Sequence, residues 1–240
     1  MGGSRLKDNV RAYSAHGWHD LGPGLRVYHQ GGLDSYCGLY ALFNLINFLK
    51  FSKERSTIDF VGAKEFAPFK ELISKPDFQR FIPATPFGGE GLEPPTLLGA
   101  LCLALSHFRI GTKVTLEDNL SVDPNDKSKW DRYFRYGSEG PFISPAEPDD
   151  AFGLACIKES KSDKLLHWVV FVGRSHLIDT GLECECESDW NGIVLDSDRG
   201  YQRWRVEVDG KPRVRLLVRR GAEPAEAPVE WIYSFVSVLI

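Results

Sequence analysis

The fold of this chain is decided by the stretch Asp34-Ser-Tyr-Cys37-Gly-Leu-Tyr-Ala-Leu-Phe-Asn-Leu-Ile-Asn-Phe-Leu49. Asp34 and Ser35 are favourable N-cap residues, and the residues after them are mostly apolar helix formers. The stretch therefore predicts a buried helix over residues 36–50, with Cys37 in its first turn. The positive end of a helix dipole favours the thiolate, which is the form of cysteine that attacks carbonyl carbons.

Two residues outside this helix are candidates to act with Cys37. Gln30 lies seven positions upstream, close enough for its side-chain amide to help bind an oxyanion beside the sulfur. His167 lies near the start of Leu-Leu-His-Trp-Val-Val-Phe-Val-Gly, a β-branched and aromatic run typical of a buried strand. Single cysteines in apolar segments are usually small core residues, and we expect this of Cys102 and Cys156. Cys37, accompanied by a glutamine and a histidine, is instead predicted to be a nucleophile.

The order Gln30, Cys37 on a helix and His167 on a strand resembles the papain-like cysteine peptidase superfamily. The pair Cys37-Gly38 and the apolar strand after His167 look most like the bacterial bacteriocin-processing (double-glycine) peptidases. The gap between Gln30 and Cys37 is one residue longer than is usual in the superfamily. The resemblance covers residues 28–49 and 165–200. It implies a papain-like fold of two lobes, with the cysteine on one lobe, the histidine on the other and the cleft between them.

The third catalytic residue has two candidates. It must accept a hydrogen bond from the second ring nitrogen of His167 and so fix the orientation of the ring. Asp196 follows a short apolar strand, as the family acid does, but it lies 29 residues after His167, which makes residues 174–192 an insertion. Asp179 lies only 12 residues after His167, within reach of a tight hairpin through residues 173–175. The resemblance favours Asp196, and Asp179 stays open as the alternative.

The remaining sequence predicts an α+β fold, with N-terminal helices packed on a C-terminal antiparallel sheet. We expect one domain: a helical lobe over about residues 28–110, a polar connection over 111–150 and a β lobe over 151–240. Within the first lobe, further helices are predicted over residues 57–81 and 97–108. Strands are predicted at residues 152–157, 167–172, 177–178, 193–195, 204–208, 214–218 and 231–239.

Composition narrows the possible partners and compartments. With 42% hydrophobic residues the chain can bury one substantial core, and a net charge of -4 predicts no attraction to nucleic acid or to an anionic membrane. No apolar stretch has membrane-spanning length and no leader pattern is present, which predicts a cytoplasmic protein or an effector delivered to another cell. The five cysteines are then expected to be free thiols.

Metal binding is not expected. Cys184 and Cys186 are separated by a single residue, whereas zinc-binding cysteine pairs usually have at least two residues between them. Acidic residues surround the pair, which is typical of a solvated loop, although His176 would be a conceivable third ligand. We predict neither a metal nor a cofactor.

These observations predict a cysteine peptidase or isopeptidase acting on a protein or peptide substrate. Cys37 would form a thioester, His167 would transfer protons, Asp196 would orient His167, and Gln30 would help bind the oxyanion. The resemblance to double-glycine peptidases implies cleavage after glycine in a protein tail. The same residues would serve an acyltransferase, a transglutaminase or a deamidase. A protein of a different class, an inactive papain-like domain used for binding, is the other alternative.

Overall fold

The structure is a computed structural model of the 240-residue chain. It describes residues 4–5, 18–22, 25–28, 36–54, 67–82, 92–117, 148–150, 152–159, 166–179, 182–183, 191–197, 200–209, 211–220 and 223–239. Among these residues, the search for a helix of sufficient length and hydrophobicity to cross a membrane found none.

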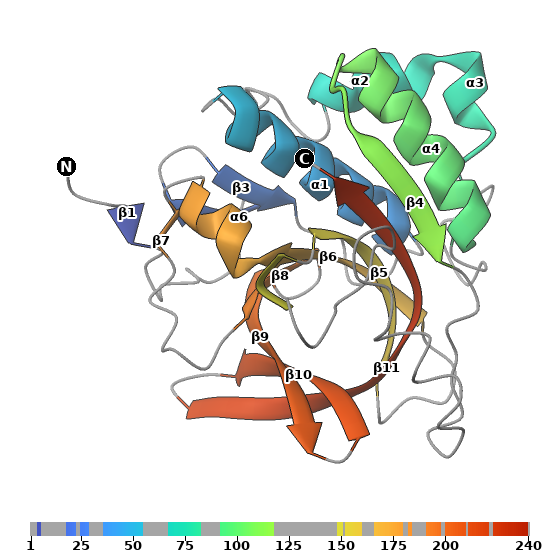
Figure 1. The fold of residues 1–240 in the computed structure, drawn as a ribbon. Helices are drawn as coiled ribbons and strands as arrows, with labels where there is room; N and C mark the ends of the chain where they lie inside the picture. The colour runs from blue at the N-terminus through green and yellow to red at the C-terminus, as the bar shows by residue number, and fades with distance from the viewer. Residues whose placement is uncertain are drawn as a thin grey trace.

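The helices of the first half of the chain gather on one side of the molecule (Figure 1). They are α1 (Cys37–Glu54), α2 (Ala67–Ser74), α3 (Pro76–Gln79) and α4 (Pro94–His107). Helices α3 and α4 begin at prolines, which suit a first turn because the missing N–H would have no intrahelical partner there. The helix predicted over residues 36–50 is confirmed and extends four residues further, and the helix predicted over 97–108 begins three residues earlier.

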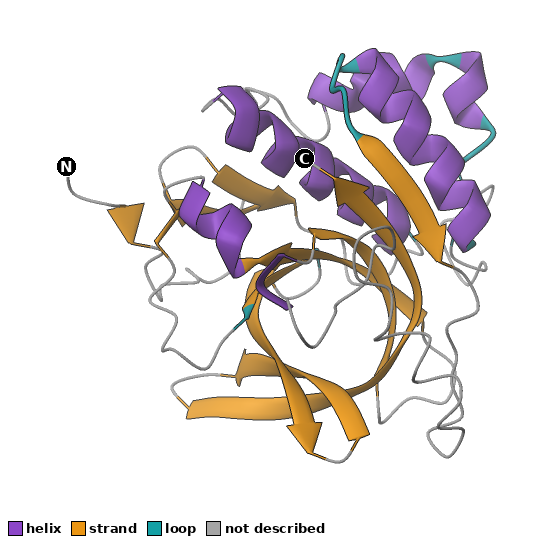
Figure 2. Cartoon of the chain, in the orientation of Figure 1, coloured by secondary structure: helices purple, strands orange, loops and turns teal. Residues whose placement is uncertain are grey.

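The strands form a sheet that closes on itself, shown in orange in Figure 2. Its members are β4 (Lys113–Glu117), β5 (Phe152–Glu159), β6 (Leu166–Gly173), β8 (Gly192–Asp196), β9 (Gly200–Asp209), β10 (Lys211–Arg220) and β11 (Glu223–Leu239). They follow the order β10-β9-β8-β6-β5-β11-β4, and every pairing in this sheet is antiparallel. An additional pairing of β10 with β11 closes six of the strands into a ring. The protein is therefore an α+β protein, as predicted.

The ring closes because β11 is long enough to pair with β10 along its first half and with β5 along its second half. The first half of this 17-residue strand pairs with β10, and its second half pairs with β5 and β4. Two irregularities in its pairing with β5, at residues 229–231 and 232–234, are places where a strand can bend sharply. Strand β4 lies in the segment that the sequence predicted to be only a polar connection, residues 111–150. That prediction was wrong for residues 113–117, because they find a partner in the remote C-terminal strand.

Short elements complete the described chain. They are β1 (Ser4–Arg5), which pairs with β7 (Leu182–Glu183), the antiparallel pair β2 (Trp18–Gly22) and β3 (Leu25–Tyr28), the 3-10 turn η1 (Pro148–Asp150) and helix α6 (Arg174–Asp179). Helix α6 follows β6 directly. The predicted strand at residues 177–178 was therefore wrong, as was the tight hairpin through residues 173–175.

The core lies between the helices and the outer face of the ring. Helix α1 packs closely on β6, and its central residues from Ala41 to Leu49 are all buried. Side chains alternate along β6 as in any strand. Trp168, Val170 and Val172 join the core with the helices, which leaves His167 on the face toward the inside of the ring.

Candidate active site

Cys37 is the first residue of helix α1. The residue is only 7% exposed, and it belongs to the hydrophobic core cluster. The backbone N–H of Tyr40 donates to the carbonyl of Tyr36 at 3.0 Å, which closes the first helical turn around Cys37. The N–H groups of a first turn have no acceptor within their helix. Cys37 therefore combines a thiol with a backbone donor at the positive end of an 18-residue helix.

His167 and Asp196 come from two neighbouring strands of the ring. Strands β6 and β8 pair with Val170 opposite Leu195. One step further along this register, Asp196 faces Val169, and His167 is the diagonal neighbour on the same face. His167 Nε2 lies 2.8 Å from Asp196 Oδ1, and the aspartate side chain is 1% exposed against 18% for the histidine. The structure thus brings Asp196 to His167, the arrangement that the sequence favoured.

The histidine also hydrogen-bonds Cys37. Because Nε2 is occupied by Asp196, Nδ1 is the ring nitrogen left for the thiol. Burial favours the neutral ring and by itself lowers the pKa of His167, but the charge and hydrogen bond of Asp196, together with the contact to Cys37, outweigh it. The pKa of His167 therefore lies well above the usual 6.5. Cys37, His167 and Asp196 form one hydrogen-bonded row across α1, β6 and β8, which we call the Cys-His-Asp row.

The alternative residue for this position, Asp179, belongs to a helix. Asp179 ends helix α6, so the chain leaves β6 through a helix and does not fold straight back beside His167. Between β6 and β8 the structure describes helix α6 and the short strand β7. Gln30 lies outside the described residues, and its place at the site stays a prediction.

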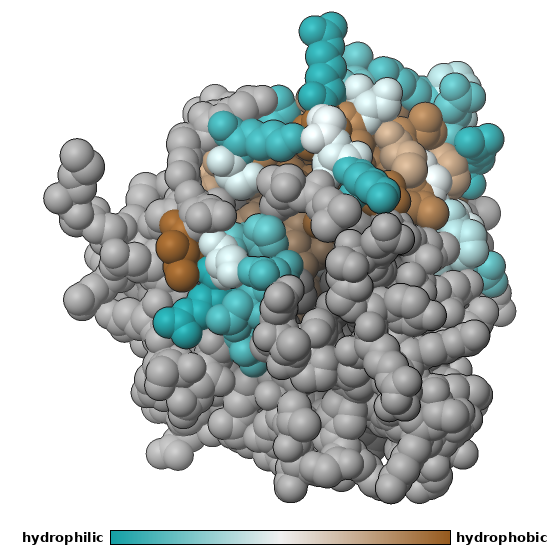
Figure 3. All heavy atoms as spheres, viewed as in Figure 1, coloured by the Kyte–Doolittle hydropathy of each residue, from teal (hydrophilic) through white to brown (hydrophobic). Residues whose placement is uncertain are grey.

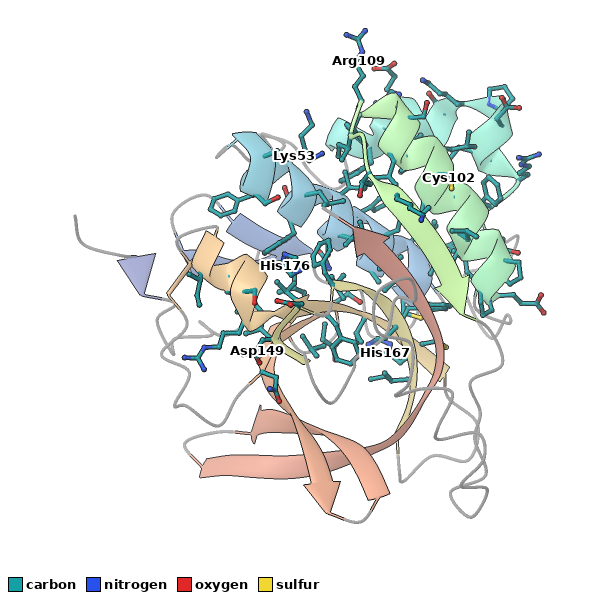
Figure 4. All side chains as sticks on the ribbon, in the orientation of Figure 1. Lys53, Cys102, Arg109, Asp149, His167 and His176 are labelled. Atoms are coloured by element: carbon teal, nitrogen blue, oxygen red, sulfur yellow. The ribbon has the colours of Figure 1, made fainter. Side chains whose placement is uncertain are left out.

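The other cysteines differ from Cys37 in their surroundings. Cys156 is buried in β5, as predicted, but Cys102 is exposed on α4, so its predicted burial was wrong. Helix α4 is apolar on most of its surface, and hydrophobic side chains show on the outside of the helices α2–α4 in Figure 3. Apolar sequence therefore did not imply burial at this position. Figure 4 shows Cys102 on the outer helices, away from His167.

His176, which the sequence offered as a third zinc ligand beside Cys184 and Cys186, forms a hydrogen bond within the protein. Its Nε2 lies 3.1 Å from the carbonyl oxygen of Asp150, so this nitrogen donates a hydrogen bond and has no lone pair for a metal. The contact ties α6 to the turn η1. The nearby cysteines 184 and 186 lie outside the described residues. Among the described residues, no group of three or more His, Cys, Asp or Glu side chains is placed to hold a metal ion.

Sequence reasoning left out one contact beside the Cys-His-Asp row. The indole Nε1 of Trp168 donates a buried hydrogen bond of 2.8 Å to the carbonyl of Leu92. Both side chains pack against Gly38, the residue after Cys37. The only signal in the sequence is that Gly38 and Trp168 each follow a candidate catalytic residue, and a strand pattern does not say what a buried tryptophan contacts.

The protonation of His167 can be tested directly. We expect a histidine NMR titration of the wild type to show His167 changing protonation above 6.5, while the pKa of His107, lowered by burial and by Lys75, lies below 6.5. Asp196→Asn should lower the pKa of His167, because it removes the charge that raises it. The pKa of His167 is higher in the folded state than in the unfolded state, so protonation of His167 stabilises the folded protein. This contribution to the free energy of unfolding is complete below about pH 6.5 and is lost as the pH rises through the folded-state pKa. A His167 that titrates at or below 6.5 in the wild type would contradict this charge arrangement.

No protein-family model matches the sequence, and neither a curated protein nor a solved structure matches it. The chemistry of the site therefore has to follow from its own geometry. A thiol at a helix start, an imidazole with a raised pKa and a buried carboxylate are hydrogen-bonded in sequence. This set of groups can form a nucleophilic thiolate and hold the proton that a leaving group needs.

Proposed function

We propose that this protein is a cysteine peptidase or isopeptidase with a papain-like arrangement, which hydrolyses an amide bond through a thioester on Cys37. The observation that carries the proposal is the Cys-His-Asp row, in which His167 contacts both Cys37 and the buried Asp196. A nucleophile, a base and a residue that orients the base are the parts that covalent catalysis requires. The three residues come from a helix and two strands and are brought together only by folding, and this convergence supports a catalytic role.

The first half of the reaction acylates the enzyme. The proton of the thiol passes to Nδ1 of His167, and the sulfur of Cys37 attacks the carbonyl carbon of the substrate. Negative charge develops on the carbonyl oxygen, and the backbone N–H of Cys37 stabilises it by donating a hydrogen bond. His167 then donates its proton to the departing nitrogen, the C–N bond breaks and an amine leaves. Asp196 keeps the ring in position throughout and favours its protonated form.

The second half releases the acid. His167, now neutral, takes a proton from water, and the resulting hydroxide attacks the thioester carbonyl. The C–S bond breaks, the carboxylic acid product leaves, and Cys37 recovers its proton. Water is thus consumed and the enzyme returns to its starting state.

Gln30 is proposed as the second donor to the oxyanion. Replacing Gln30 by alanine is expected to lower the rate of the chemical step about 10²-fold, the usual loss for one oxyanion donor, with substrate binding little changed. Single-turnover kinetics with a saturating substrate would measure this step. A loss below about threefold would show that another group stabilises the oxyanion.

The proposed substrate is a protein or peptide tail that ends in glycine at the cleaved bond. Its support is the sequence resemblance to double-glycine peptidases. Cleavage of a peptide library, together with electrophilic probes built on ubiquitin-like tails, would define the preference. A preference for bulky residues before the cleaved bond would contradict this part of the proposal.

The experiment that separates an enzyme from an inactive binding domain is thiol labelling at pH 6. We expect iodoacetamide to label Cys37 to one equivalent before it labels Cys102, although Cys102 is the exposed thiol and Cys37 is 7% exposed. The reason is that nucleophilicity depends on the thiolate, which His167 stabilises, more than on exposure. Peptide mass spectrometry would locate the label, and Cys102→Ser is the matched control. Faster labelling of Cys102 would contradict an activated Cys37.

A further inference from the structure

Helix α1 and strand β6 touch at a second point beside the catalytic pair. Gly38 follows Cys37, and Trp168 follows His167. A methyl group built on Gly38 would lie 3.3 Å from Trp168 Cδ1 and 3.2 Å from both Cβ and Cδ1 of Leu92. These separations are shorter than the 3.4–4 Å of ordinary van der Waals contact. A side chain at residue 38 would therefore require Trp168 or Leu92 to move by a few tenths of an ångström, and the absence of one allows helix α1 to approach β6 this closely.

The two neighbours of Gly38 are themselves held in place. Trp168 is 2% exposed, and its Nε1 donates to the carbonyl of Leu92 at 2.8 Å in the core. Leu92 lies two residues before Pro94, the first residue of α4, and at this end of the helix the Leu97 N–H donates to the carbonyl of Glu93 at 2.9 Å. The indole thus joins the beginning of α4 to β6, and the start of α1 rests against both.

This contact lies on the other side of β6 from the catalytic histidine. Side chains of successive strand residues point to opposite faces, so Trp168 faces the helices while His167 faces the inside of the ring. Both residues share one short piece of backbone. A shift of α1 away from Trp168 would therefore also move Cys37 relative to His167.

We propose that Gly38, Trp168 and Leu92 form a registration contact that sets the distance between the Cys37 thiol and the His167 ring. Gly38 and Trp168 are then positioning residues, because neither needs to touch the substrate. The contact explains why two residues that carry no reactive group lie directly beside the nucleophile and the base. Its consequence for peptide hydrolysis rests on the proposed function, but its effect on the geometry of the pair does not.

The test uses two substitutions in the full chain. Gly38→Ala adds a methyl group that would crowd Trp168 and Leu92, and Trp168→Phe keeps an aromatic ring but removes the donor to Leu92. A displacement of about 1 Å can cost about 10²-fold in a reaction that depends on alignment. Because the methyl group forces a smaller shift, we expect Gly38→Ala to slow alkylation of Cys37 by iodoacetamide at pH 6 on the order of tenfold, and Trp168→Phe to slow it by less.

The second readout is the pKa of His167. Among the described residues, the titratable groups that face this ring are Asp196 on β8 and Cys37 on α1, and both raise its pKa. Moving Cys37 away should therefore lower the NMR-measured pKa of His167 while the Asp196 contact remains. A role limited to core packing would change the unfolding midpoint without moving this pKa.

Gly99→Ala is the matched control. It makes the same change inside helix α4, where the new methyl group would lie 2.9 Å from Phe81 Cε1, a tighter contact than at Gly38. The control should unfold at a changed temperature but keep the wild-type alkylation rate and the wild-type pKa of His167. Equal effects of Gly99→Ala and Gly38→Ala would overturn the proposal, because they would indicate general loosening of the core.

The outcomes separate this inference from the proposed function. If the wild type hydrolyses no peptide, the peptidase proposal fails, yet alkylation and NMR still decide whether the contact positions Cys37. If Gly38→Ala does not fold, Trp168→Phe decides. The registration contact is wrong if a folded variant at either position keeps both the alkylation rate and the His167 pKa of the wild type.

Discussion

Replacing Cys37 by alanine is expected to abolish amide hydrolysis, leaving no turnover above that of the uncatalysed reaction. The thioester cannot form without the sulfur, and neither His167 nor Asp196 is placed to attack a carbonyl in its stead. The cost to the fold should be small, about 1 kcal/mol of the free energy of unfolding, because alanine fills most of the space of a small side chain. Hydrolysis of the best peptide from library profiling measures activity, and urea unfolding measures stability.

Two controls make this result specific to Cys37. Cys102→Ala removes an exposed thiol from α4 and should leave the rate unchanged. Cys37→Ser keeps a hydroxyl in place of the thiol and should be nearly as inactive as alanine, because a serine hydroxyl is far harder to deprotonate beside an imidazole. Turnover by Cys37→Ala of any substrate that the wild type cleaves would show that the nucleophile is another residue.

Replacing Asp196 by alanine is expected to lower the rate by about 10²- to 10⁴-fold, in analogy with loss of the orienting acid in a serine triad. The carboxylate is buried and hydrogen-bonds Nε2 of His167 at 2.8 Å, so its removal frees the ring to rotate. It also removes the charge that raises the pKa of His167, and the neutral ring then stabilises the thiolate less well. The pH profile of the remaining activity should therefore change together with its size.

Asp196→Asn separates the loss of ring orientation from the loss of charge, and Asp179→Ala tests which carboxylate is the acid. The asparagine can still hold the ring through a hydrogen bond but carries no charge, so its rate should fall between those of the wild type and Asp196→Ala. Asp179 ends helix α6, and its replacement should be nearly silent. A large loss in Asp179→Ala combined with a silent Asp196→Ala would reverse the assignment of the acid.

The elements that carry Cys37 and His167 could be predicted because their information is local. A capped apolar run of helical length indicates α1, and a β-branched run indicates β6, whichever partners they later find. The boundaries of α1 and α4 differ from the predicted ones by at most four residues. Local pattern failed where a segment depends on a distant partner. Strand β4, predicted to be only part of a polar connection, is held by β11, more than a hundred residues away, and Cys102 is exposed because nothing described packs on that side of α4.

By itself, then, the sequence determined the helix that begins with Cys37, the strand that carries His167 and the α+β class, because each depends on residues that are neighbours in the chain. Only the tertiary structure decided which carboxylate meets His167. That choice depends on the register of β6 against β8, which brings Asp196 to His167, and register is set by the pairing of whole strands. The tertiary structure also brought together the residues that pack beside Cys37 and His167. Gly38, Leu92 and Trp168 are remote in the chain, and they meet only when α1, α4 and β6 pack into one core.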